Sequence, residues 1–319
     1  MTGDTTRLAA VLKGPLEPGN PQAAPTLAQR ADRLRKATES VFTLPTLPTV
    51  FDGVLRMLEN PGTSTRKLSQ ALSRDQVLTA RLLKTANSAY YGFPQKVSTT
   101  SLALVVLGWD ATRDVVLATS VMEIFQKARR DGRFDIVRFW DHSLAVAFAA
   151  RELARKLHWE SPGEVFTAGL LHDIGKVVLH EHHPDLFQEV QRRVLLEPGL
   201  SMEIEIEVLG ATHPQVGGWL CRHWNLPPNL CDSVEFHHVP QSCPPENQAL
   251  AALVALADHF VHQTESVEPK IDGSVEVDQM TLSILSSHGI SVREEDIPYL
   301  RDHVVLEIQR ATSLGEAFR

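Results

Sequence analysis

The chain of 319 residues lacks several features that mark other classes of protein. It has only three cysteines, Cys221, Cys231 and Cys243, and no two of them form a CxxC pair. No apolar run approaches the ~20 residues that a membrane helix requires, and residues 1–20 lack the apolar core of a signal peptide. The formal net charge of −8 gives no basic nucleic-acid footprint. We therefore expect a cytoplasmic protein, without a membrane segment, whose cysteines are buried thiols.

The chain also lacks the alternation of apolar and polar residues that a half-buried strand requires. From Val50 to Thr264 apolar residues recur at helical spacing instead, as in Leu78, Leu82 and Leu83. Turn signals separate these stretches at residues 60–62, 90–94, 107–110, 131–133 and 161–163. The sequence therefore predicts an all-α protein built as two packed helical subdomains.

Composition divides the chain into four segments. Residues 1–25 hold four of the nineteen prolines and predict a mobile leader. None of the fourteen histidines precedes the composition shift near Arg129–Phe134. That shift separates an N-terminal helical subdomain, residues 26–130, from a second helical subdomain, residues 131–265.

A polar, acidic break at 264–273 precedes the last segment, a helical extension over residues 266–319. We expect helices there at about 278–287 and 293–312. Four apolar residues at helical spacing would form the buried stripe of the second helix. They are Ile297, Leu300, Val304 and Ile308.

The most informative stretch is AGLLHDIGKVVL, in which an apolar run carries the adjacent residues His172 and Asp173. Burying this pair is unfavourable unless a charge compensates it. A divalent metal is the simplest compensation, because imidazole and carboxylate together suit first-row transition metals. We expect a turn at Gly175 to expose the pair to a cavity.

Five further residues could complete a metal site. His142 is expected to open a helix and to share an inward stripe with Ala145 and Leu153. The other four are His213 at a helix start, His237 and His238 at a helix end, and Asp258 in the apolar stretch LAALVALADHF. Taken singly, each imidazole fits a hydrogen-bonded core or surface residue, and the aspartate fits a helix cap.

Taken together, seven potential ligands are too many for one four-coordinate zinc and suit two metals bridged by one carboxylate. A further histidine cluster lies in VLHEHHPD, where polar neighbours predict a solvated surface. Its members are His180, His182 and His183.

The motif HDIGK resembles the signature of the HD superfamily of metal-dependent phosphohydrolases. The order of the seven candidates resembles the ligand order of the HD-GYP branch, whose members hydrolyse cyclic dinucleotides. The GYP segment should follow the His-His pair, but here the chain reads HHVPQSCPPEN.

The N-terminal half resembles the HDOD family instead. The resemblance covers about residues 40–265 and rests on LPTLP, RDQVLTARLLKTANSAYYG, LGWDATRDVV and WNLPPNLCDSVEFHH. The resemblance implies an all-helical signalling module. Many HDOD domains have lost the HD metal ligands, whereas this chain keeps them.

The resemblance implies which residues would hold each metal. His142, His172, Asp173 and Asp258 would hold one ion, and Asp173, His213, His237 and His238 the other, so that Asp173 bridges. It favours iron, with manganese, zinc, nickel or cobalt as alternatives. Lys176 stands where the HD-GYP lysine faces phosphoryl oxygens, although a solvated helix-end lysine is an equally good interpretation.

Two functions follow from these patterns. The first is a bacterial-type HDOD signalling protein that acts through protein partners and whose metal site is structural or sensory. The second is a phosphohydrolase or phosphodiesterase acting on a cyclic dinucleotide or another nucleotide, with Asp173 and Lys176 as catalytic residues. Lys156 and Arg222 are the other basic candidates for such a site.

Nucleic-acid binding by the N-terminal helices is the least favoured function. A basic bias does exist there, but we interpret it as a solvated face in an acidic protein. The residues concerned are Arg66, Lys67, Arg74, Arg81 and Lys84.

Overall fold

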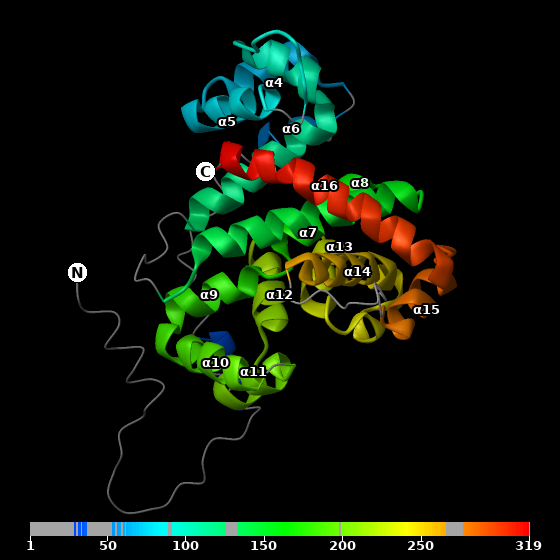
Figure 1. The fold of residues 1–319 in the computed structure, drawn as a ribbon. Helices are drawn as coiled ribbons and strands as arrows, with labels where there is room; N and C mark the ends of the chain where they lie inside the picture. Colours follow the sequence, from blue (N-terminus) through cyan, green and yellow to red (C-terminus); the bar gives the residue numbers. More distant parts are fainter. Residues whose placement is uncertain are drawn as a thin grey trace, which may run out of the picture.

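The computed structural model describes residues 62–88, 91–125, 133–197, 199–265 and 277–318. It also describes residues 29, 31–32, 34–36, 53–54, 56–58 and 60. All regular structure in these residues is helical, as the sequence predicts (Figure 1). The predicted leader, residues 1–25, and the predicted boundary near residue 130 lie outside the described residues. Among the described helices, none combines the length and the apolar character that a membrane crossing requires.

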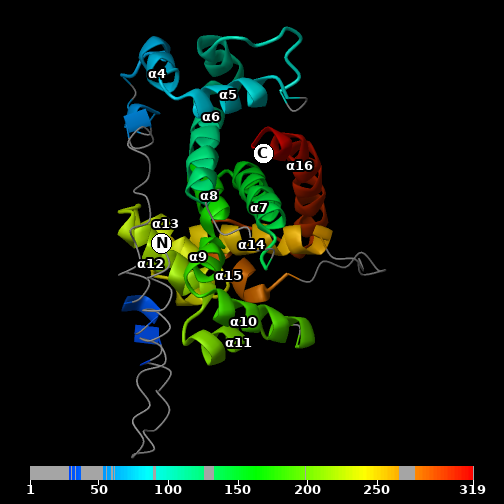
Figure 2. The ribbon, with the colours of Figure 1, turned by 90° about the vertical axis from the view of Figure 1, so that its left-hand side faces the viewer.

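Between residues 62 and 125, the described part of the chain forms three helices, α4 (Thr65–Leu72), α5 (Gln76–Ala86) and α6 (Thr100–Phe125). Side chains cap the N-termini of α4 and α5. Ser64 accepts a hydrogen bond from Lys67 N, and Asp75 accepts hydrogen bonds from Val77 N and Leu78 N. Helix α6 is kinked at Gly108, whose φ of 74° is favourable for glycine. Beyond the kink, α6 runs from α4 and α5 to the remaining helices (Figure 2).

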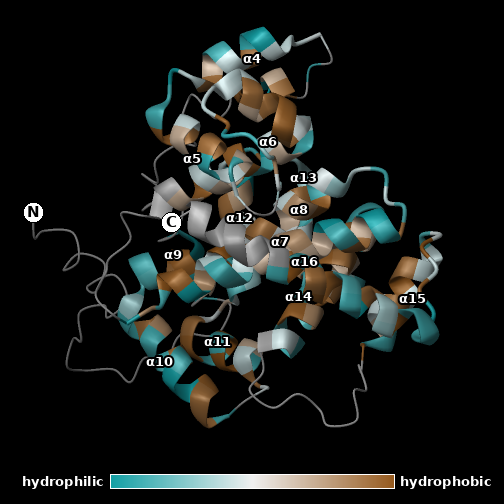
Figure 3. Cartoon of the chain, turned by 45° about the horizontal axis from the view of Figure 1, so that its top comes forward, coloured by the Kyte–Doolittle hydropathy of each residue, from teal (hydrophilic) through white to brown (hydrophobic). Residues whose placement is uncertain are grey.

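The remaining chain forms ten helices and three short 3-10 turns among the described residues. The helices are α7 (Ile136–Lys156), α8 (Pro162–Leu171), α9 (Ile174–His182), α10 (Pro184–Leu196), α11 (Ser201–Leu209), α12 (His213–His223), α13 (Pro228–Phe236), α14 (Gln248–Glu265), α15 (Gln279–Ser287) and α16 (Ile297–Phe318). The turns are η1 (Pro240–Ser242), η2 (Pro245–Asn247) and η3 (Glu294–Asp296). Most helices carry both hydrophobic and hydrophilic residues, the pattern of amphipathic helices that bury one face (Figure 3).

Two clusters of buried apolar side chains hold the helices together. The first draws residues from both sides of the predicted boundary near residue 130, from Leu34 to Val234. The second joins α7, α14, α15 and α16. Of the predicted C-terminal stripe, Ile297, Leu300 and Val304 are buried and Ile308 is partly buried, so that stripe is confirmed. The residue limits of the subdomains remain predictions.

Two details of the helix limits differ from the predictions. Helix α7 begins at Ile136, after the N-cap Asp135, so His142 lies in its second turn and does not open it. Helix α16 begins at Ile297, because the preceding residues Glu294–Asp296 form the 3-10 turn η3.

Two side-chain environments were predicted wrongly. His180 and His183 are buried, with 3% and 4% of their surface exposed, because they lie where α9 meets α10 and the ring of Phe134. Arg81, which we expected on a solvated face, is also buried and directs its Nη1 atom toward Met122 Sδ at 3.8 Å. The three cysteines are buried and free, as expected.

Candidate metal centre

His172 and Asp173 form the turn between α8 and α9. The apolar residues on both sides of the turn, Leu171 and Ile174, are buried in the core. Their burial places the pair in the interior as well. As a result His172 is completely buried and Asp173 is 3% exposed. The predicted burial of this pair is confirmed.

Gly175 does not form the turn that the sequence suggested, because it lies inside α9. A Cβ atom at this position would stand 1.9 Å from His213 O and 2.8 Å from Gly217 N. The glycine therefore allows the backbone of α9 to approach that of α12. This approach brings Asp173 next to His213.

His213 occupies the first turn of α12, as predicted. Thr212 caps this helix, and Gln215 completes a reciprocal capping box. His213 Nε2 lies 3.0 Å from Asp173 Oδ1. On the other side of the ring, Nδ1 donates to Glu205 of α11 at 2.8 Å.

His172 and His237 are each fixed by a backbone carbonyl. His172 Nδ1 donates to Gly169 O at 2.7 Å, and His237 Nδ1 donates to Val234 O at 2.8 Å. Because a carbonyl only accepts, the proton is on Nδ1 and the lone pair is on Nε2. Both Nε2 atoms are buried and form no hydrogen bond within the described residues. Buried polar atoms normally form a hydrogen bond or bind a metal. The free lone pairs of these two Nε2 atoms are therefore suited to metal coordination.

Three predicted ligands, His142, His172 and Asp173, have donor atoms within 4.8 Å of one another, and Asp258 lies close to both histidines. His142 Nε2 lies 3.2 Å from Asp258 Oδ1 and 3.9 Å from Asp173 Oδ2. His172 Nε2 lies 3.4 Å from Asp173 Oδ2 and 3.7 Å from Asp258 Oδ1. Four tetrahedral ligands at ~2.0–2.2 Å from a metal are separated from one another by about 3.3–3.6 Å. The observed separations are therefore close to those that a metal site needs.

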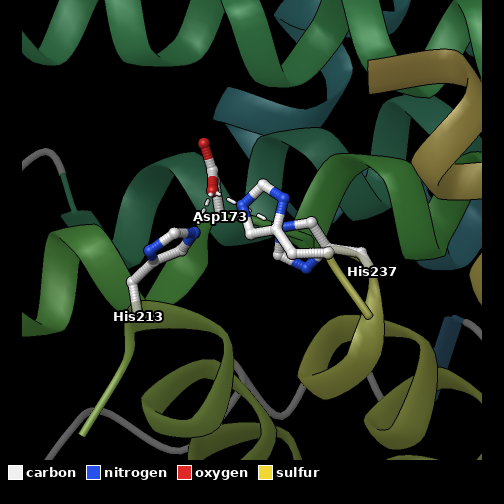
Figure 4. A group of neighbouring side chains, drawn as sticks. Asp173, His213 and His237 are labelled. Atoms are coloured by element: carbon white, nitrogen blue, oxygen red, sulfur yellow. Dashed lines mark ion pairs between the residues drawn. The ribbon is translucent and has the colours of Figure 1, made fainter. Parts of the chain in front are cut away.

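A second group lies on the Oδ1 side of the same aspartate. Asp173 Oδ1 lies 3.0 Å from His213 Nε2 and 3.9 Å from His237 Nε2 (Figure 4). Donor atoms of these residues and of His238 all lie within 4.8 Å of one another. The two oxygens of Asp173 therefore face two different groups of histidines.

The protonation of Asp173, His237 and His238 suits metal binding. Burial alone would raise the pKa of Asp173, but Lys176, whose Nζ lies 2.6 Å from Oδ2, and His172 hold that pKa well below its usual range. Burial lowers the pKa of His237 well below its ordinary value and that of His238 to about 4. Both imidazoles are therefore neutral at neutral pH, the form that ligates metals.

The sequence did not reveal two residues of the site, His262 and Glu205. His262 follows Asp258 by one helical turn on α14, and its Nε2 lies 3.3 Å from Asp258 Oδ1. Its spacing of four residues from Asp258 was a usable signal. Glu205 had no such signal, because it reads as one of several acidic residues in SMEIEIEVL.

The other basic candidates are not close to the cluster. Lys156 follows His142 by fourteen residues on α7, a distance of about 21 Å along the helix axis. Arg222 stands at the far end of α12 from His213 and pairs with Asp232 at 3.0 Å and with Glu235. Of the basic residues that we considered, only Lys176 contacts the site.

Comparisons with known proteins identify the family to which the chain belongs. The family model of the HDOD domain matches residues 44–240, which include all the predicted ligands except Asp258. A provisionally assigned phosphohydrolase of Shewanella amazonensis SB2B has a similar crystal structure, with 26% identity and a TM-score of 0.70 over 90% of this chain and 98% of that one.

An HDOD domain protein of unknown function from Geobacter sulfurreducens is also similar. It has 26% identity and a TM-score of 0.73 over 88% of this chain and 97% of that one. An uncharacterized protein of Treponema pallidum (strain Nichols) is 24% identical over 256 residues, or 79% of this chain. The match covers 47% of that relative, so the chain spans about half the length of the curated relative it matches. With the family model matching more than half of its residues, the chain belongs to the HDOD domain family.

Proposed function

We propose that the cluster binds two divalent metal ions and that the protein is a signalling regulator that acts through protein partners. One observation carries the metal assignment: the two carboxylate oxygens of Asp173 face separate groups of donor atoms. One ion would be held by His142, His172, Asp173 and Asp258. The other would be held by Asp173, His213, His237 and His238.

The origin of the ligands supports a regulatory role. They come from α7, the α8–α9 turn, the start of α12, the end of α13 and α14. Binding would therefore link five separate segments, and its free energy would add to the stability of the fold. Helix α7 also packs on α16, and α8 packs on α6. Metal occupancy can thus alter the packing of the N-terminal helices and of α16. A partner bound to these helices would detect the change.

The charge of the site favours an anion once metals are bound. Three buried carboxylates, Asp173, Asp258 and Glu205, are opposed by Lys176 alone among the residues considered. Two divalent cations would leave the centre with a net positive charge. Iron is favoured by resemblance to HD-GYP proteins, and manganese, zinc, nickel and cobalt fit the same ligand types.

A phosphohydrolase is the second candidate, because the cluster is open on one side. The side chain of His262 is 58% exposed, and that of Lys176 is 29% exposed. Bound metals would supply an acidified water and stabilise negative charge on a phosphoryl group. Asp173 would hold the ions, and Lys176 would donate to a phosphoryl oxygen of a cyclic dinucleotide or another nucleotide. The provisional name of the Shewanella protein supports this candidate.

Elemental analysis of protein purified without added metal tests the assignment. We expect about two ions per chain in the wild type and a loss of both in Asp173→Asn, because this residue belongs to both groups. Asp185→Asn, which changes a carboxylate with a 91% exposed side chain, is the matched control. A folded wild type without metal, or an Asp173→Asn variant that keeps two ions, would contradict the proposal.

Two further measurements separate the regulatory role from the enzymatic one. Amide hydrogen exchange should slow in α6 and α16 when metal is added, if occupancy is transmitted to these helices. Turnover of a cyclic dinucleotide by metal-replete protein, abolished in Asp173→Asn, would instead establish the phosphodiesterase. Unchanged exchange in both helices would remove the support for regulation.

A further inference from the structure

His262 lies on the solvent side of the metal cluster. Its side chain is 58% exposed, compared with 10% for His142 and 1% for His172. Its ring centroid is 4.8 Å from that of His142, with the two planes inclined by 35°. These three histidines therefore run from the surface to the interior in the order His262, His142, His172.

Asp258 connects the exposed and the buried ends of this series. Its Oδ1 atom is 3.3 Å from His262 Nε2, 3.2 Å from His142 Nε2 and 3.7 Å from His172 Nε2. Donor atoms of His142, Asp258 and His262 lie within 4.8 Å of one another, close enough to share one cation. His142 and Asp258 thus belong both to this outer trio and to the inner group around Asp173.

We propose that His142, Asp258 and His262 form an outer cation position through which divalent metal exchanges between solvent and the inner group. This inference rests on the proposed metal binding by the inner group. Three protein ligands leave coordination positions for water, so an incoming ion can lose its water molecules in steps. Because two ligands are shared, transfer inward requires only that His262 be replaced by His172 and Asp173.

The simpler interpretation is a surface pair, in which His262 contacts Asp258 one helical turn away and does nothing else. The two interpretations differ in a rate. A surface pair has no effect on metal uptake, whereas the loss of an outer ligand slows both uptake and release. The number of ions bound at equilibrium stays the same, because the inner ligands are intact.

Stopped-flow loading of the metal-free, full-length protein with Co²⁺ measures this rate through the visible absorption of the bound ion. We expect His262→Gln to slow Co²⁺ uptake, and its release to EDTA, severalfold, because the ion loses one of its three outer ligands. His259→Gln is the matched control, because this neighbour on α14 contacts Gln263. His262 is exposed, so circular dichroism should show an unchanged fold.

Each outcome decides a specific point. Equal rates in the wild type and His262→Gln, or equal slowing in His259→Gln, would overturn the outer position. Fewer Co²⁺ ions bound by His262→Gln at equilibrium would overturn it too, since His262 would then be a resident ligand. A wild type that takes up no Co²⁺ would refute the proposed metal binding itself.

A second variant observes the outer position directly. In His262→Cys the thiolate would replace the imidazole, and thiolate coordination gives Co²⁺ an intense near-ultraviolet absorption. The three native cysteines are buried and lie outside the cluster. We expect this absorption to appear early in loading and then to decay as the ion moves inward. Its absence throughout loading would contradict the proposal.

Discussion

Glu205 holds His213 through two contacts. Its Oε1 accepts from the ring Nδ1 at 2.8 Å, and its Oε2 accepts from the backbone N–H at 2.7 Å. Both residues are buried, with 3% and 2% of their surface exposed. The carboxylate therefore keeps the proton on Nδ1 and turns Nε2 toward Asp173. Such carboxylate–histidine pairs orient metal ligands and increase their basicity.

Replacing Glu205 by glutamine should weaken metal binding. The amide carries no charge and keeps only one accepting oxygen, because an NH2 group replaces the second oxygen that one donor of His213 contacts. We expect metal affinity to fall by about 10–100-fold, measured by competition with a chelating dye. Glu203→Gln changes an exposed carboxylate on the same helix and should have no effect. Equal affinities for both variants would show that Glu205 does not position a ligand.

Gly175 should tolerate no side chain. Alanine would place a Cβ atom 1.9 Å from His213 O, so α9 and α12 must separate. Overpacking of this kind typically lowers the free energy of unfolding by about 1–3 kcal/mol, and here the obstacle is backbone. Urea denaturation would measure the loss, and metal affinity should fall with it.

Gly53→Ala is the matched control for this variant. Gly53 is helical, and within the described part of the chain no atom beyond its own helix backbone and chain neighbours lies within 4 Å of the place that an alanine methyl group would take. Alanine there should raise the free energy of unfolding by up to about 1 kcal/mol, through its higher helix propensity. If Gly175→Ala is as stable as Gly53→Ala, the close approach of α9 and α12 is not a constraint.

The sequence predicted those parts of the site that local patterns control. Thr212 before His213 and Pro214 after it mark a helix start, and capping puts the imidazole in the first turn. Asp258 stands alone among apolar residues of its helix, which predicts its burial. The pairing of His142 with Asp258 depends instead on how α7 packs against α14, which no local pattern specifies. Local patterns selected the seven candidate ligands, and the resemblance supplied their division between two metals.

The errors have a common physical origin. His180 and His183 lie in a polar stretch, which predicts exposure, but the contact between α9 and α10 covers them. Arg81 was assigned to the surface because of its charge, although its long apolar stem can be buried. Glu205 was overlooked for the same reason. In each case a tertiary contact overrode the polarity of the residue.

A buried ion cluster joins α6, α7 and α16. Arg151 of α7 pairs with Asp114 of α6 and lies 3.7 Å from Glu307 of α16. Burial raises the pKa of Asp114 from 3.8 to about 6, although Arg151 and Arg113 act in the opposite direction. The folded state thus binds a proton at Asp114 more tightly than the unfolded chain does.

This cluster should make stability depend on pH. Because its folded pKa is raised, Asp114 contributes most at low pH, and this contribution is lost as pH rises from about 4 to about 6. The difference in unfolding free energy between wild type and Asp114→Asn should therefore fall over that range, by up to about 3 kcal/mol. Urea denaturation of the metal-free proteins measures it. A difference that rises with pH would show that pairing with Arg151 outweighs burial.

Lys176 has two interpretations that phosphate binding can separate. Its Nζ contacts Asp173 Oδ2 at 2.6 Å, and part of the side chain reaches solvent. In the first, Lys176 serves only to balance the charge of Asp173. In that case Lys176→Met should tighten metal binding, because a neighbouring cation is removed. Phosphate binding to the metal-loaded protein should then be unchanged. If Lys176 also faces phosphoryl oxygens, the same variant should bind inorganic phosphate at least about tenfold more weakly, because hydrogen bonds to charged groups contribute about 1.5–3 kcal/mol. Isothermal titration with phosphate decides between them, and only the weaker binding supports the phosphohydrolase.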